Sequence, residues 1–211
     1  MIDPELCAAL SALGYTFKNE DLLQTAFTHS SYVNEHKAES NERSEFLGDC
    51  ALNFIVGEYL YETYPDYGEG LLSARRAATV SRAPLARLVD ELGLLRYLRV
   101  GAGVNKSAFS DKTRSDLFEA LVGAVYADGG MNACRMFLAR NFFDKVKPER
   151  DYKTELQELA VKRGCNVVYK VNDSANGFTA VVSVGGDKFT GKGNTKHAAE
   201  IDAARHALAK A

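Results

Sequence analysis

No stretch of this 211-residue chain is apolar enough to cross a membrane. A membrane-spanning helix needs roughly 18 to 20 predominantly apolar residues, whereas the apolar run Cys50–Val56 is short and contains Asn53. The segment Met1–Leu13 also lacks the basic residues and the apolar core of a secretory signal. We therefore expect a protein that neither enters a membrane nor is secreted.

Cysteine is scarce and widely spaced. The four cysteines form no C-x-x-C pair of the kind that binds zinc, and they are too far apart for a dense disulfide framework. They are Cys7, Cys50, Cys134 and Cys165. This distribution predicts a protein of the reducing cytoplasm, in which the cysteines are small buried hydrophobic residues.

A strong net charge is also lacking, because the formal charge is −2. From Asp151 onward there are nine Lys or Arg residues against seven Asp or Glu residues, which leaves seventeen against twenty-one in the preceding part. This weak asymmetry fits an acidic, metal-binding body joined to a mildly basic appendage. Charge alone does not indicate nucleic-acid binding.

The chain does contain an unusual set of carboxylates on a predicted helix that runs from about Asn41 to Tyr64. At about 100° per residue, Glu42, Glu45 and Asp49 fall within an arc of roughly 60° on one face. Like charges beside apolar surface repel one another and resist desolvation, so a folded protein keeps them only where a cation or a partner neutralises them. A divalent metal is the simplest candidate, although this spacing taken alone is more typical of a solvated acidic face.

Apolar side chains fill most of the remaining circumference of this helix, and we expect protein to cover them on several sides. They are Phe46, Leu47, Leu52, Phe54, Ile55, Tyr59 and Leu60. Gly48 is a poor helix former, and its position among these residues predicts the close approach of another backbone or of a ligand.

A second acidic pair, Asp116 and Glu119, lies three residues apart in the apolar helical pattern Ser115–Tyr126. If this helix packs beside the first, several carboxylates point at one place. Hard cations such as Mg²⁺ prefer oxygen ligands and keep several waters, which suits an ion held by carboxylates against a substrate phosphate. The two helices together therefore predict a magnesium site.

The remaining patterns before residue 146 are also helical. Asp3 and Asp21 are expected to cap two helices, and His29 is more typical of a structural residue at a helix end than of a phosphate ligand. Gly101–Ser107 lacks the spacing of a phosphate-binding loop and is expected to be a flexible connection. The predicted helices are Pro4–Leu13, Leu22–Phe27, Glu69–Val80, Ala83–Leu92, Leu94–Leu98 and Met131–Phe143, the last preceded by a turn at Asp128–Gly130.

The charged stretch Asp144–Asp151 predicts a domain boundary, because the periodicity changes after it. The pattern beyond it indicates a helix, three strands and a helix, at Thr154–Arg163, Val167–Val171, Phe178–Val184, Lys188–Gly191 and Thr195–Ala209. Such an order gives an antiparallel sheet with both helices against one face. We expect an all-α domain at residues 1–146, followed by a small α-β-β-β-α domain of the α+β class at residues 151–211.

The decapeptide Asn41–Cys50 resembles the signature motif of the ribonuclease III family, and the C-terminal segment resembles a double-stranded-RNA-binding domain. The motifs occur in the expected order over nearly the whole chain, which makes the resemblance specific. Further matches are Thr28–Tyr32, Glu69–Ser73, Asp116–Gly123, Tyr152–Glu158 and Thr195–Glu200. Ser44 stands where relatives commonly have leucine, but it does not touch the acidic set.

The resemblance implies an endoribonuclease that hydrolyses double-stranded RNA with Mg²⁺-activated water, or with Mn²⁺ in its place, and without an organic cofactor. By the same resemblance, Glu45, Asp116 and Glu119 hold the metal, Asp49 and Glu119 are catalytic, and Glu42 and Glu69 are supporting acids. The products would carry 5′-phosphate and 3′-hydroxyl ends with short 3′ overhangs. The expected substrates are structured precursors of rRNA, mRNA and tRNA.

Two kinds of partner follow from the resemblance. The enzyme would be a homodimer, with Phe46 inserted into the partner subunit. Double-stranded RNA would meet Lys153, Thr154, Gln157, Glu158, Lys192 and Lys196, partly in a minor groove and partly at phosphates. His197 replaces a usual lysine, and the loop Asn172–Gly177 lacks the usual Gly-Pro and histidine. We therefore expect modest intrinsic affinity with a shallow salt dependence, compensated by avidity in the dimer.

Two other classes of protein share parts of this pattern. One is a binding protein that grips structured RNA without cutting it, which the full acidic set disfavours. The other is an all-helical nucleotide pyrophosphatase, which would leave the α-β-β-β-α segment without a role.

Overall fold

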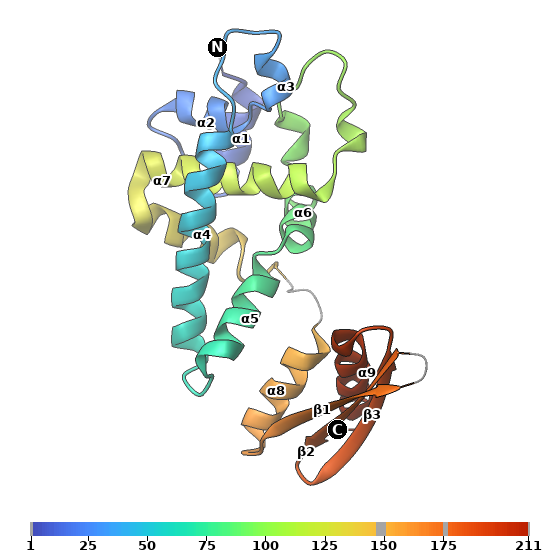
Figure 1. The fold of residues 1–211 in the computed structure, drawn as a ribbon. Coiled ribbons are helices and arrows are strands. Elements are labelled where there is room, and N and C mark those ends of the chain that lie inside the picture. The colour runs from blue at the N-terminus through green and yellow to red at the C-terminus, as the bar shows by residue number, and fades with distance from the viewer. Residues whose placement is uncertain (1, 147–150, 175–176, 211) are drawn as a thin grey trace. The chain divides into compact units, whose positions relative to one another are not determined.

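The computed structural model describes residues 2–146, 151–174 and 177–210. The chain falls into two compact units, one made of Met1–Tyr59 and Thr79–Glu149, the other of Leu60–Ala78 and Arg150–Ala211. The elements of residues 2–146 are all helical apart from an isolated bridge between Thr28 and Arg99, and the α-β-β-β-α order follows, as the sequence predicts (Figure 1). Half of the expected boundary stretch Asp144–Asp151 falls on residues 147–150, which lie outside the described residues.

Three short helices begin the first unit. The side chain of Asp3 caps α1, Pro4–Ala12, by accepting a hydrogen bond from the Glu5 N–H. Helix α2 is Glu20–Ala26, and the prediction that Asp21 caps it is wrong, because Asn19 accepts the hydrogen bond of the Asp21 N–H instead. His29 Nδ1 accepts from the Ser31 N–H at the start of α3, Ser30–Val33, which confirms the expected structural role.

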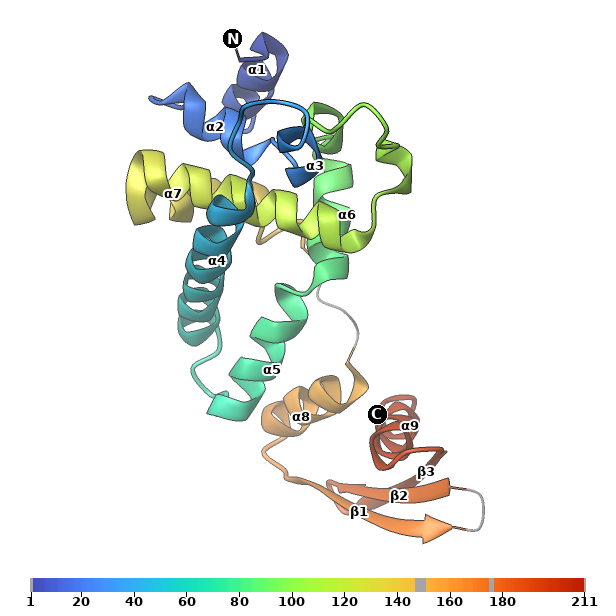
Figure 2. The ribbon, with the colours of Figure 1, turned by 45° about the horizontal axis from the view of Figure 1, so that its top comes forward.

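Two long helices, α4 and α7, cross in the first unit (Figures 1 and 2). Helix α4 is Glu42–Thr63, close to the predicted range, and α7 is Asp111–Asn141. The turn predicted at Asp128–Gly130 is a break within α7, because Gly130 adopts φ 75° and ψ −173°. The core-facing side of α7 is buried over most of its length, so this helix forms the centre of the unit.

Helix α6, Arg82–Glu91, packs against α7 and buries Leu85, Leu88 and Val89. The predicted helix Leu94–Leu98 is only a single 3-10 turn at Leu95–Tyr97, and a second such turn lies at Lys106–Ala108. None of the helices in the described part of the chain combines the length and hydropathy that crossing a bilayer requires.

The second unit contains α5, Glu69–Thr79, up to Ala78, together with the C-terminal elements. These are α8 Tyr152–Lys162, β1 Val167–Ser174, β2 Gly177–Val184, β3 Asp187–Gly193 and α9 Lys196–Leu208. The strands pair antiparallel in the order β1-β2-β3, with Val168 opposite Ser183 and Val181 opposite Thr190. As predicted, both helices lie on one face of the sheet (Figure 2).

Small residues let α9 lie close to this sheet. A Cβ added to Gly191 would lie 2.1 Å from the backbone nitrogen of Ala203. The core between helix and sheet consists of Leu156, Ala180, Val182, Ala199, Ala203, Ala204 and Ala207. The predicted strands were too short at both ends of the sheet, since β1 extends to Ser174 and β3 to Gly193. The residues that the prediction missed carry no apolar side chains, so they give no pattern typical of a strand.

The expectation that protein covers the central helix on several sides is met in part. Leu52, Ile55 and Leu60 are buried, but Phe46 is 73% exposed and Phe54 is 55% exposed. The helix therefore also has an open apolar face in the single chain.

The prediction that all four cysteines are buried is wrong. Only Cys134 is fully buried, while Cys50 lies exposed on α4 and Cys7 and Cys165 are half-buried. All four are free thiols.

Candidate metal centre and RNA-binding surface

The crossing of α4 and α7 is closest at two glycines. A Cβ added to Gly48 would lie 1.7 Å from the carbonyl oxygen of Glu119, and one added to Gly123 would lie 2.0 Å from the carbonyl oxygen of Ser44. Any side chain at either position would push the helices apart. This confirms the predicted close approach at Gly48, and it brings the acids of the two helices together.

Glu45, Asp116 and Glu119 each offer a carboxylate oxygen, and these oxygens lie within 4.8 Å of one another. All three side chains are half-buried. Glu45 comes from the first turn of α4, and the other two come from consecutive turns of α7. The separation leaves room for a cation that contacts all three, so the structure brings together the three predicted metal ligands.

This group carries more negative than positive charge. The pKa of Glu119 is raised to about 8, first by burial and then by the negative charges of Asp49, Asp116 and Glu45. The pKa of Glu45 is also raised, mainly by burial and by Asp116, with an opposing effect of Lys112. A divalent cation would relieve this repulsion, and carboxylate oxygens are the donors that hard cations prefer. The residues therefore fit a metal ion.

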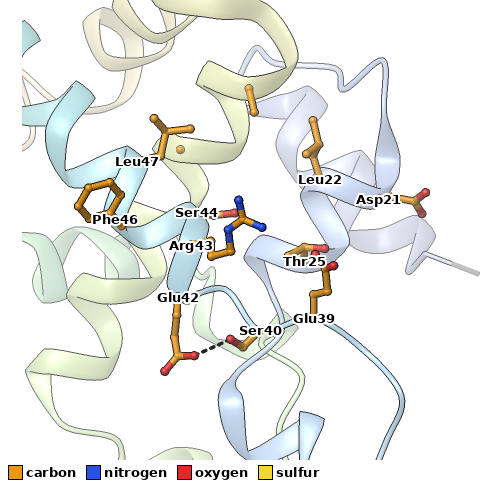
Figure 3. Close-up of a pocket in the computed structure, with 12 residues that line it drawn as sticks. Asp21, Leu22, Thr25, Glu39, Ser40, Glu42, Arg43, Ser44, Phe46 and Leu47 are labelled. Carbon is orange, nitrogen blue, oxygen red and sulfur yellow. Dashed lines mark hydrogen bonds between the residues drawn. The ribbon is translucent and has the colours of Figure 1, made fainter.

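Asp49 and Glu42 lie on α4 beside this group. Asp49 is exposed, and among the surrounding charges it raises the pKa of Glu119 most. Asn53 donates hydrogen bonds of 2.7 Å to Asp49 Oδ1 and 3.1 Å to the Asp49 carbonyl oxygen. Glu42 accepts a hydrogen bond of 2.8 Å from Ser40 Oγ (Figure 3).

Glu69, the second predicted supporting acid, lies at the start of α5 in the second unit. Its carboxylate accepts a hydrogen bond of 2.9 Å from Ser73 Oγ, one turn along the helix. It is not a member of the three-carboxylate group.

Two residues near the site were missed by the sequence analysis. Lys112 Nζ lies 2.5 Å from Asp116 Oδ2, and Asn53 orients Asp49 as described. Each of these two residues lies four positions from the acid that it contacts, and side chains at this spacing on a helix are neighbours. The spacing is the sequence signal that could have revealed Lys112 and Asn53.

The predicted RNA-binding residues of α8 differ in their surroundings. Gln157 is exposed, whereas Thr154 is buried and its hydroxyl donates to Asp151 Oδ2. Lys153 Nζ donates to Glu200 Oε2 at 2.6 Å. Within the second unit, Glu158 forms an ion pair with Arg75 of α5.

The two lysines expected at phosphates lie at the end of β3 and the start of α9. Lys192 and Lys196 are both exposed. The Lys196 ammonium lies 5.7 Å from the ring centre of Phe178. Lys196 is thus available at the N-terminal end of α9, where the helix dipole also favours an anion. The Lys192 N–H donates to Asp202 Oδ2, which lies further along α9.

A pocket of about 750 Å³ lies next to Phe46 in the first unit (Figure 3). It is formed by α2, the segment before α4, the first turns of α4, and α7. Its lining residues are Asp21, Leu22, Thr25, Glu39, Ser40, Glu42, Arg43, Ser44, Phe46, Leu47, Gly123 and Ala127. The exposed Phe46 ring therefore stands at the edge of a partly apolar hollow.

Comparison with family models assigns both parts of the chain. A model described as ribonuclease-III-like matches residues 19–146, and the model of the double-stranded RNA binding motif matches residues 152–211. The chain belongs to the ribonuclease III family. The expected resemblance is confirmed, and so are the fold class and the double-stranded-RNA-binding segment.

Full-length relatives agree with this assignment. A protein of Symbiobacterium thermophilum named Ribonuclease 3 is 42% identical over 212 residues, which cover 93% of this chain and 90% of the relative. A Ribonuclease 3 of Listeria monocytogenes is 38% identical over 218 residues, with 94% of each chain covered. This family member is therefore an endoribonuclease that acts on double-stranded RNA, from a metal-dependent family.

Solved structures resemble the first part of the chain. The nuclease domain of ribonuclease III from Campylobacter jejuni matches with a TM-score of 0.60 and 32% identity, covering 65% of this chain and 95% of that domain. That structure is described as flexible in a region involved in dimer formation. A second structure of the same domain matches with a TM-score of 0.57 and 34% identity, covering 63% of this chain and 89% of that domain.

Proposed function

We propose that this ribonuclease III family member hydrolyses phosphodiester bonds of double-stranded RNA with Mg²⁺ held by Glu45, Asp116 and Glu119. The observation that supports these ligands is the convergence of three carboxylate oxygens within 4.8 Å. The raised pKa of Glu119 supports the same assignment, because it reports negative charge that the protein does not neutralise by itself. Mn²⁺, which also accepts oxygen ligands, is expected to substitute.

The chain's own side chains have separable roles in this proposal. When bound, the ion supplies positive charge and makes a water molecule more acidic. Glu45, Asp116 and Glu119 hold and position it. Asp49 is exposed beside them and Asn53 donates to its Oδ1, so its Oδ2 is the proposed acceptor of a proton from the attacking water. Hydrolysis would leave 5′-phosphate and 3′-hydroxyl ends with short 3′ overhangs.

Glu42 and Glu69 are proposed as supporting acids. Glu42 lies three residues before Glu45 and adds to its negative surroundings, which supports a role in shaping the charge of the metal centre. The role of Glu69 is proposed only because Glu69–Ser73 matches a motif of the family. We propose that residues 1–146 form the catalytic domain and that residues 151–211 form the RNA-binding domain.

The RNA-binding part is proposed to contact the duplex through Lys153, Thr154, Gln157, Glu158, Lys192 and Lys196. The side chains of Gln157, Lys192 and Lys196 are exposed, which supports their proposed contacts with RNA. Lys153 and Glu158 would first have to leave Glu200 and Arg75, since both are paired in the free protein. That exchange lowers the net gain from each contact.

The enzyme is proposed to act as a homodimer. Phe46 and Phe54 form an exposed apolar stripe on α4, and a pocket lies beside Phe46. Insertion of each Phe46 into the pocket of the partner subunit would bury both features, and a two-fold axis makes such an exchange self-complementary. The proposed substrates are structured rRNA, mRNA and tRNA precursors of the cytoplasm, a compartment that suits four free thiols.

One assay tests the proposal against its rivals. Purified protein is incubated with a long RNA duplex and Mg²⁺, with an EDTA control and with free nucleoside triphosphates as a separate substrate. Discrete short products that disappear with EDTA are the expected result. An intact, shifted duplex would indicate a protein that only binds RNA, and hydrolysis of the free nucleotides would indicate a pyrophosphatase.

A further inference from the structure

Lys112 is a positively charged side chain in direct contact with one of the proposed metal ligands, Asp116. Its Nζ lies 2.5 Å from Asp116 Oδ2, four residues later on α7. The Asp116 side chain is only 20% exposed, but that of Lys112 is 56% exposed. The ammonium group thus reaches the carboxylate from the solvent side of the group.

The influence of Lys112 extends beyond this ion pair. Its charge opposes the rise in pKa of both Glu45 and Glu119. The compensation is incomplete, because one ammonium faces a group of three carboxylates. The Lys112 ammonium therefore neutralises part of the negative charge that a divalent cation would neutralise more fully.

We propose that Lys112 is an internal counter-cation that competes with the divalent ion for Asp116 and so sets the ion concentration at which the site fills. This inference rests on the proposed metal centre. An ion bound between Glu45, Asp116 and Glu119 would repel the ammonium at this short range. Because Lys112 is more than half exposed and its side chain is long, it can move into water at small cost, so the ion displaces it rather than being excluded.

Binding of Mn²⁺ alone, measured by the loss of the free-ion signal in electron paramagnetic resonance, tests this competition without RNA. We expect Lys112→Met to lower the dissociation constant for Mn²⁺ by about two- to fivefold, the scale of one exposed ion pair. Lys112→Arg keeps the charge and is expected to bind close to wild type. Lys145→Met is the matched control, because it removes the same charge from an ion pair with Glu91.

Thermal melting of the same variants provides a second readout and checks folding. Without metal, Lys112→Met should melt below wild type, and saturating Mn²⁺ should remove that difference. Equal Mn²⁺ affinity for Lys112→Met, Lys145→Met and wild type would overturn the role of Lys112 while leaving the metal centre intact. If wild type takes up no Mn²⁺ in the concentration range tested, both the metal centre and the competition are refuted.

Discussion

Asn53 holds the carboxylate of Asp49 from one turn further along α4, through a hydrogen bond of 2.7 Å to Oδ1. A second hydrogen bond, to the Asp49 carbonyl oxygen, fixes the amide group itself. The carboxylate proposed to accept the water proton is therefore oriented by a residue of its own helix, and neither hydrogen bond involves the second helix, which supplies two of the metal ligands. Asn53 is a positioning residue in this scheme.

Asn53→Ala is expected to slow cleavage by about three- to tenfold, which corresponds to the net contribution of one solvent-exposed hydrogen bond. The loss should appear in kcat and leave KM for the duplex unchanged, because Asn53 is not among the proposed RNA contacts. Asn53→Ser keeps a donor and should recover part of the rate. Cleavage by Asn53→Ala at the wild-type rate would remove Asn53 from the mechanism.

Glu119→Gln is expected to abolish cleavage while leaving duplex binding intact. The substitution keeps the size of the side chain but removes the charge that a cation requires, whereas the proposed RNA contacts lie in residues 151–211. A gel-shift assay and a cleavage assay on the same preparation give the two readouts. Normal turnover by this variant would refute the assigned site.

Glu119 should also make the stability of the metal-free protein depend on pH. Its pKa rises from an ordinary value of 4.5 to about 8 on folding, so the folded state binds this proton more tightly than the unfolded state. The stabilisation is complete below pH 4.5 and is lost as the pH rises through about 8. In EDTA, the wild-type melting temperature should fall over this window and that of Glu119→Gln should fall less. Parallel curves for the two proteins would contradict this reasoning.

Gly48→Ala is expected to lower the free energy of unfolding by about 2 to 3 kcal/mol, because the new Cβ would overlap the Glu119 carbonyl oxygen. Separation of the helices should weaken metal binding as well. Gly70→Ala is the matched control, since nothing lies within 4 Å of its Cβ position on α5, and alanine favours a helix by up to about 1 kcal/mol. Urea unfolding measures both, and equal stability of the two variants would show that the crossing is looser than described.

Phe46→Glu is expected to convert a dimer into a monomer in sedimentation experiments. A charge placed on an apolar side chain that enters the pocket of the partner subunit loses its hydration without a partner. Met136→Glu is the control, because Met136 is 74% exposed, similar to the 73% of Phe46, but lies on α7. A wild-type protein that sediments as a monomer, or a Phe46→Glu variant that stays dimeric, would exclude the proposed interface.

Local patterns in the sequence were sufficient for much of the fold. Helical periodicity depends on a few neighbouring residues, so it placed Glu42, Glu45 and Asp49 on one face of α4 and gave the α-β-β-β-α order of the second part. The capping residue of a helix is harder to predict where two neighbouring residues can both supply a side-chain oxygen. At α2 both Asn19 and Asp21 can do so, and Asn19 is the residue that caps the helix. The break at Gly130 was predicted as a turn, since glycine readily adopts a positive φ.

By itself, the sequence determined that two apolar helices carry acids at helical spacing and that a double-stranded-RNA-binding segment follows them. Only the tertiary structure decided which acids meet, because Glu45 and Asp116 are brought together by a crossing of helices whose closeness depends on Gly48 and Gly123. It also decided that Phe46 stays exposed and that Lys112 shares Asp116. These relationships depend on distances between segments far apart along the chain, and no local pattern specifies such distances.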